Sequence, residues 1–230
     1  MRATRPLISA LAAAAVCLVP AACGDGGDDR RTEPAPNAGT SSGLGPERFE
    51  ALEDVYVAAL PIDELEDDED VDPRAFAAAA RAAIAACEAL AEDDPLLAAI
   101  RRQCPVVNEF TEQLLRIDRC EAETGDACLA PIEDARASVR RFERLGRRAD
   151  RVIARSQLTP ACRRALTTPE LAYDVYDAFE RALALLERGL RRGALDDVEE
   201  AERILTATDA KAQQLPDARA SLERFRRGCA

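Results

Sequence analysis

From residue 46 to the end of the chain, apolar residues recur every three or four positions, the spacing that places them on one face of an α-helix. The clearest example is a predicted helix at 129–155, in which seven small or apolar residues follow each other in steps of three and four. This pattern is typical of a seam between packed helices in a bundle. The seam residues are Ile132, Ala135, Val139, Phe142, Gly146, Ala149 and Ile153.

Start and stop signals divide the rest of this region into further helices. An Asp or Thr followed by proline, as at Asp72, Asp94 and Thr168, is typical of a helix N-terminus. Gly193 is a stop signal, and no segment shows the alternation of a strand. We therefore expect an all-α bundle of four to five main helices. Besides 129–155, the predicted helices cover 46–59, 73–90, 95–119 with an interruption at Pro105, 169–192, and 194–227 with a break at Pro216.

The first 22 residues have a different pattern. Arg2 and Arg5 precede an apolar run of 13 residues at 7–19, and small residues follow it. The run is too short to span a membrane as a helix, and the order of charged, apolar and small segments is that of an export signal. We therefore predict that residues 1–22 are a signal peptide.

The signal ends in Pro20-Ala21-Ala22-Cys23, which resembles the lipobox of bacterial lipoprotein precursors. In that family the small residues before the cysteine fit the lipoprotein signal peptidase, and the thiol receives a diacylglyceryl group. The sequence departs from the family at Pro20, where an aliphatic residue is usual, although Val19 lies just upstream. The resemblance implies that Cys23 carries acyl chains such as palmitate, which anchor the protein to the cell membrane on its extracytoplasmic side.

Ordinary cleavage near Ala21 or Ala22 is the alternative, and it would leave Cys23 as a free thiol in a secreted protein. The number of cysteines favours lipidation. Of the eight cysteines, Cys17 leaves with the signal, and acylation of Cys23 leaves six, a number that can pair completely. Residues 23–45 hold Leu44 as their one large apolar side chain, so we predict a flexible linker that precedes a single α-helical domain at 46–230.

The composition excludes several classes of function. The chain has no histidine, so it cannot form a Ser-His-Asp or Cys-His catalytic group or a His-ligated metal site. A net charge of −12 argues against binding to nucleic acid. We expect neither an enzyme nor a bound cofactor or metal.

In an exported protein the six remaining cysteines predict structural disulfides. No Cys-x-x-Cys motif supports a redox site. Nearness in the sequence favours three pairs, namely Cys87–Cys104, Cys120–Cys128 and Cys162–Cys229.

Two charged segments of opposite sign are candidates for a binding role. Residues 63–72 hold eight acidic side chains, but an EF-hand starting at Asp68 would place Pro73 and Ala79 where glycine and glutamate are required. A solvated acidic loop is the favoured interpretation. On the predicted helix at 129–155, arginines recur along the side away from the seam, where they either contact an anionic surface or form a solvated face. These arginines are Arg140, Arg144, Arg148, Arg151 and Arg155.

The densest aromatic cluster comprises Tyr173, Tyr176 and Phe179, which we interpret as core packing. The whole sequence predicts a membrane-anchored lipoprotein that acts as a binding or structural module at the cell envelope, with an envelope protein or polyanion as a further partner. One alternative is a carrier or sensor that holds a small apolar ligand between helices. A carboxylate-dependent hydrolase is the other, and it requires two inward carboxylates with a raised pKa.

Overall fold

The computed structural model describes residues 43–66, 73–118 and 125–230. Every regular element in these residues is an α-helix, so the all-α class predicted from the sequence is confirmed. In chain order the helices are α2 (Pro46–Glu66), α3 (Pro73–Glu88), α4 (Pro95–Arg101), α5 (Cys104–Asp118), α6 (Gly125–Arg155), α7 (Pro160–Leu166), α8 (Glu170–Arg192), α9 (Leu195–Ala212) and α10 (Ala218–Cys229).

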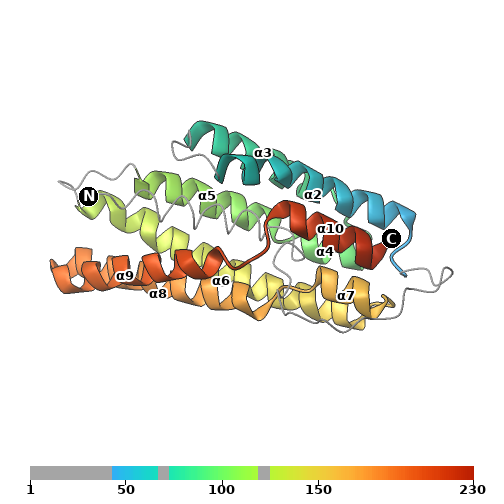
Figure 1. The fold of residues 1–230 in the computed structure, drawn as a ribbon. Helices are drawn as coiled ribbons and strands as arrows, with labels where there is room; N and C mark the ends of the chain where they lie inside the picture. The colour runs from blue at the N-terminus through green and yellow to red at the C-terminus, as the bar shows by residue number, and fades with distance from the viewer. Residues whose placement is uncertain (1–42, 67–72, 119–124) are drawn as a thin grey trace.

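The longer helices form an elongated bundle in which each packs against the next (Figure 1). The order of contact is α2, α3, α5, α6, α8 and α9, and α10 returns to pack against α2 and α7. The short α4 and α7 lie against α6. Buried apolar side chains from all of these helices form one connected core.

Helix α6 lies in the middle of this order because both flanks of its apolar seam need cover. All seven seam residues predicted from the sequence are buried. Helix α5 packs on one side of α6 and α8 packs on the other. The predicted seam is therefore confirmed as the central contact of the bundle.

The predicted start and stop signals have different outcomes. Asp72 lies outside the described residues, and Thr168 does not cap α8, which begins after Pro169 without a side-chain cap. The Asp94 carboxylate accepts hydrogen bonds from the backbone N–H groups of Leu96 and Leu97 at 2.9 and 3.1 Å, which caps α4. The same carboxylate accepts a hydrogen bond from Arg48 of α2. At the other end of a helix, Gly193 has a φ of +63°, the left-handed conformation that ends α8.

Several element boundaries differ from the sequence-based prediction. Helix α6 begins at Gly125, four residues before the predicted start at 129, and the break in the predicted helix 95–119 precedes Cys104 instead of lying at Pro105. Helix α2 continues through Pro61 to Glu66, because Ile62 is fully buried and Leu65 packs against the core. The prediction at 46–59 was therefore too short. Helix α7 was missed, although its start carries the same signal as the others. The Thr159 hydroxyl accepts a hydrogen bond from the Cys162 N–H, and Pro160 follows as the first helical residue.

The described chain begins before the predicted domain boundary at residue 46. Leu44 is 1% exposed, so it belongs to the core and not to the predicted linker. Gly43 precedes it with a φ of +76°, and a Cβ added there would lie 1.9 Å from the Gln157 carbonyl oxygen. Only glycine fits this contact, which holds the start of the described chain against the segment after α6.

Between described residues, the structure contains two of the three disulfides expected from the sequence. Cys87 at the end of α3 is bonded to Cys104 at the start of α5, with a Cα–Cα distance of 6.0 Å. Cys162 of α7 is bonded to Cys229 of α10, with a Cα–Cα distance of 4.5 Å. Cys128 is buried and disulfide-bonded, but Cys120, its expected partner, lies outside the described residues.

We predict that the Cys162–Cys229 bond stabilises the fold more than the Cys87–Cys104 bond. The two bonds span 67 and 17 residues, and a longer closed loop loses more entropy in the unfolded chain. Replacing each pair with alanine should lower the free energy of unfolding by about 4.4 and about 3 kcal/mol respectively. Urea unfolding of the two variants measures this, and the opposite order would contradict it.

Asp94→Ala is expected to destabilise the protein by about 1–2 kcal/mol at neutral pH, because it removes the α4 cap. Burial acts to raise the pKa of Asp94, but hydrogen bonds from Leu97, Arg48 and Leu96 outweigh it and lower the pKa. Since the folded pKa lies below the unfolded value, the stabilisation exists above about pH 4 and disappears as the pH falls through the folded pKa.

Thermal unfolding of the wild type and of Asp94→Ala at pH 7 and near pH 2.5 tests this pH dependence. The difference in stability should shrink at the lower pH. Asp94→Asn is the matched control, because its side chain still caps the helix without the charge. A difference that is constant with pH would show that the charge of Asp94 has no part in the effect.

Candidate functional site

Four of the five arginines predicted to form a stripe on α6 are exposed and form no ion pair with any residue that the structure describes. We call these four, Arg144, Arg148, Arg151 and Arg155, the arginine face. Arg140 is different, because its guanidinium lies 2.5 Å from the Glu180 carboxylate of α8. At about 100° per residue, the arginine face points about 180° away from the α6 seam. It therefore faces away from the core.

Two other arginines of α6 join it to the neighbouring helices. Arg136 donates hydrogen bonds to Glu180 and Glu187 of α8, at 2.5 and 3.0 Å. On the opposite flank, Arg141 lies 3.1 Å from Glu109 of α5. Glu180, Glu187 and Glu109 thus pair with arginines on the two flanks of α6, whereas the arginine face has no such pair among the described residues.

The predicted aromatic cluster is part of the core, as the helical spacing indicated. Tyr173, Tyr176 and Phe179 are all nearly fully buried. Phe179 packs edge-on against Phe110 of α5, and Tyr176 packs edge-on against Phe142 of α6. These contacts join three helices at their apolar interface.

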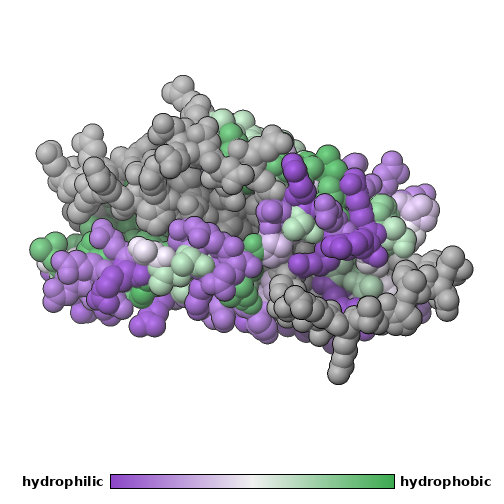
Figure 2. Space-filling view, viewed as in Figure 1, coloured by the Kyte–Doolittle hydropathy of each residue, from purple (hydrophilic) through white to green (hydrophobic). Residues whose placement is uncertain are grey.

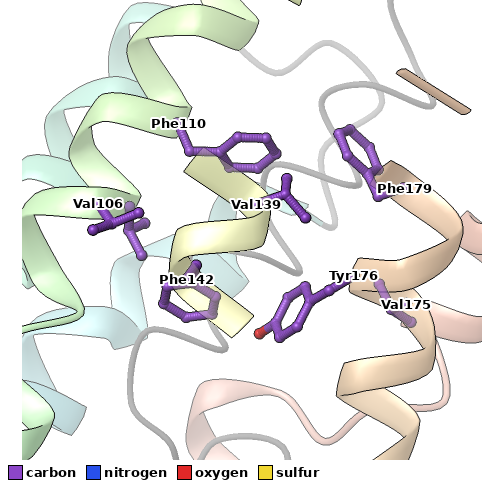
Figure 3. Close-up of a pocket in the computed structure, with 8 residues that line it drawn as sticks. Val106, Phe110, Val139, Phe142, Val175, Tyr176 and Phe179 are labelled. Atoms are coloured by element: carbon purple, nitrogen blue, oxygen red, sulfur yellow. The ribbon is translucent and has the colours of Figure 1, made fainter. Parts of the chain in front are cut away.

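A small hollow remains between α5, α6 and α8 (Figure 3). Its volume of about 20 Å³ is close to what one water molecule requires, so it is too small for an organic ligand. Its wall is apolar apart from the hydroxyl of Tyr176, which has no hydrogen-bond partner among the described residues. The hollow is lined by Val106, Val107, Phe110, Val139, Phe142, Val175, Tyr176 and Phe179.

Tyr173 does not line this hollow and instead belongs to a polar cluster between α6 and α8. Its hydroxyl donates a hydrogen bond of 2.5 Å to one oxygen of Asp150. The other oxygen of Asp150 accepts a bond of 3.0 Å from the Thr168 N–H, just before α8 begins. The Arg147 guanidinium lies 4.1 Å from the centre of the Tyr173 ring. The cluster therefore fixes the start of α8 against α6.

The electrostatics of this cluster follow from its burial. Burial raises the pKa of Asp150, although hydrogen bonds from Tyr173 and Thr168 act against the change. Burial and the neighbouring Asp150 carboxylate both raise the pKa of Tyr173. The phenol therefore stays protonated, and its O–H group donates the hydrogen bond to the Asp150 carboxylate.

The carboxylates with a raised pKa do not form an acid–base pair. Partial burial and the charge of Glu143 raise the pKa of Asp177, which is exposed on α8. Asp150 uses both of its oxygens in the contacts with Tyr173 and Thr168. Asp150 therefore supplies a structural contact between helices.

In the described part of the chain, no cluster of three or more Cys, Asp or Glu side chains has the arrangement of a metal site. Most of the acidic run at 63–72 lies outside those residues, and its first four residues belong to α2. No helix within the described ranges is long and apolar enough to cross a membrane.

The described surface carries few large apolar side chains. Among the described residues only Val57 and Leu195 are large, apolar and exposed. Figure 2 shows one face, on which hydrophilic residues extend along α8 and α9 with small hydrophobic areas between them. The described surface thus offers charged groups to a partner and no extended apolar patch.

Comparisons with known proteins gave no match: no family model matches the chain, and neither the curated proteins nor the solved structures include a similar one.

Two structural features were missed by sequence reasoning. The contact of Asp150 with Tyr173 joins residues on separate helices, and no spacing rule identifies such a pair. The second feature is the packing of Gly43 and Leu44 beside Gln157. The sequence contained a signal for it, because Leu44 is the large apolar residue in a polar segment and has a glycine on each side.

We predict that Tyr173→Phe and Asp150→Ala each lower the free energy of unfolding by about 1.5–3 kcal/mol, since each removes a buried hydrogen bond to a charged group. In the double variant the loss should be smaller than the sum of the single losses, because the two residues share this bond. Chemical denaturation of the four proteins measures the coupling.

Tyr176→Phe is the matched control for Tyr173→Phe. It also removes a buried hydroxyl, but one with no partner among the described residues, so its stability should stay the same or rise slightly. Equal losses at the two tyrosines, or fully additive losses in the double variant, would show that the Asp150 contact does not stabilise the bundle.

Proposed function

We propose that this protein is an extracytoplasmic lipoprotein, anchored to the cell membrane through acylated Cys23, whose helical part acts as a binding or structural module at the cell envelope. The observation that carries the proposal is that the described cysteines are oxidised to disulfides. Every cysteine that the structure describes is disulfide-bonded. Structural disulfides are typical of proteins in oxidising, extracytoplasmic compartments, so this supports export.

The pairing of the other cysteines in disulfides also supports the acylation of Cys23. Four of the described cysteines pair with one another, and Cys128 needs one further partner. Cys120 lies eight residues from Cys128, which makes it the expected partner and leaves Cys23 as the odd cysteine after the signal. A lipid-modified cysteine needs no partner, and this removes the problem of an exposed thiol in an oxidising compartment.

A binding or structural role fits the described surface better than catalysis or transport of a ligand. The hollow between α5, α6 and α8 has room for about one water, and Asp150 is engaged by Tyr173 and Thr168. The prominent group left without a partner in the described chain is the arginine face. We therefore assign the function to the surface of the bundle and not to its interior.

Cys23→Ser is expected to abolish incorporation of labelled palmitate and to release the protein from the membrane fraction, because the hydroxyl cannot replace the thiol as the site of acylation. Growth of producing cells with labelled palmitate, followed by membrane fractionation, tests this. Cys128→Ser is the control, and it should keep the label. Retention of the Cys23→Ser variant on membranes without label would contradict anchoring through Cys23.

A further inference from the structure

The contact of Gly43 with Gln157 places the start of the described chain at one end of the arginine face. Gln157 follows Arg155, the last arginine of the face, by two residues. Leu44 is buried in the core, so the chain is held at this position. Figure 1 shows that the first residues of α2, α7 and the C-terminus lie at this same end of the bundle. The segment that leads back to Cys23 therefore departs from beside the arginine face.

The length of that segment suits a contact between the arginine face and the membrane. Cys23 precedes Gly43 by 20 residues. A polar chain of this length has an average reach of about 25 Å. The arginine face extends from Arg144 to Arg155, which is about 16 Å along the helix. An anchor at Cys23 thus allows the whole face to lie on the surface that holds the anchor.

The distribution of charge makes the arginine face the side of the molecule best suited to an anionic membrane. The whole chain has a net charge of −12, so an anionic surface repels most of it. The arginine face, by contrast, holds four exposed arginines that form no ion pair with any described residue. Arginine forms paired hydrogen bonds with phosphate oxygens, which makes it well suited to phospholipid headgroups.

We propose that the arginine face binds the anionic phospholipid headgroups of the membrane that carries the anchor, and that it thereby orients the bundle with α6 toward the lipid. This proposal rests on the proposed anchoring at Cys23. Attachment through Cys23 favours lipid over other anions, because it keeps the membrane within reach of the arginine face at a high effective concentration.

Arginine labelling on vesicles tests the proposal. The full mature chain from Cys23, produced without acylation, is coupled through its Cys23 thiol to maleimide-headgroup lipid in vesicles. The vesicles consist of phosphatidylcholine alone or of phosphatidylcholine with phosphatidylglycerol. Phenylglyoxal labelling followed by mass spectrometry gives a rate for each arginine. The matched controls are four exposed arginines on other helices or at their ends that form no ion pair with described residues, Arg81, Arg102, Arg181 and Arg192.

On the anionic vesicles the four arginines of the face should be labelled at least about threefold more slowly than on neutral vesicles, and the controls should not change. Salt at about 0.5 M should remove the protection, because it screens exposed charges. Protection by soluble polyglutamate but not by anionic vesicles would assign the face to an acidic polymer, and equal rates on both vesicles would exclude a lipid contact. Either result overturns the proposal.

Because the anchor is supplied chemically in this experiment, its result does not depend on whether cells acylate Cys23. Failure of arginine protection would therefore leave the lipoprotein assignment standing. Failure of palmitate incorporation would remove the anchor without deciding what the arginine face binds.

Discussion

Burial of the apolar seam of α6 is the contact on which the rest of the bundle depends. A helix of 31 residues with seven buried positions on one side needs cover on both flanks, and α5 and α8 supply it. These two helices then expose apolar surfaces of their own, which α3 and α9 cover in turn. Ion pairs such as Arg136–Glu180 and Arg141–Glu109 lie on the two flanks of α6 and join it to α8 and α5. The order of the helices thus follows from the need to bury the seam.

The two disulfides between described cysteines hold the parts that the seam does not reach. Helix α10 packs against α2 and α7, and the ring of Phe225 stacks 4.9 Å from that of Tyr56. Its bond from Cys229 to Cys162 ties the last residues to α7, which itself contacts α6. The bond between Cys87 and Cys104 joins α3 to α5 in the same way. Each cross-link therefore connects an outer helix to one next to α6.

The sequence predicted those features that depend on local chemistry. Periodicity identified the seam, and capping residues such as Asp94 marked the helix starts. It did not predict that α2 continues past Pro61, because this depends on the burial of Ile62 against other helices. Similarly, the sequence did not separate Arg140 from the arginine face, since the separation depends on Glu180 of a neighbouring helix. Contacts between distant helices, including Asp150 with Tyr173, require the three-dimensional arrangement.

Burial of the seam also determines the direction in which the arginine face points. Once the seam is buried, the opposite side of α6 must face outward, and its arginines lie three or four residues apart, where like charges repel. Each such pair costs a few tenths of a kcal/mol in an isolated helix. The chain has 43 acidic residues that could neutralise these charges, and its other α6 arginines, such as Arg136, are neutralised in this way. A row of arginines with no ion pair to any described residue is what an anionic partner outside the molecule would stabilise.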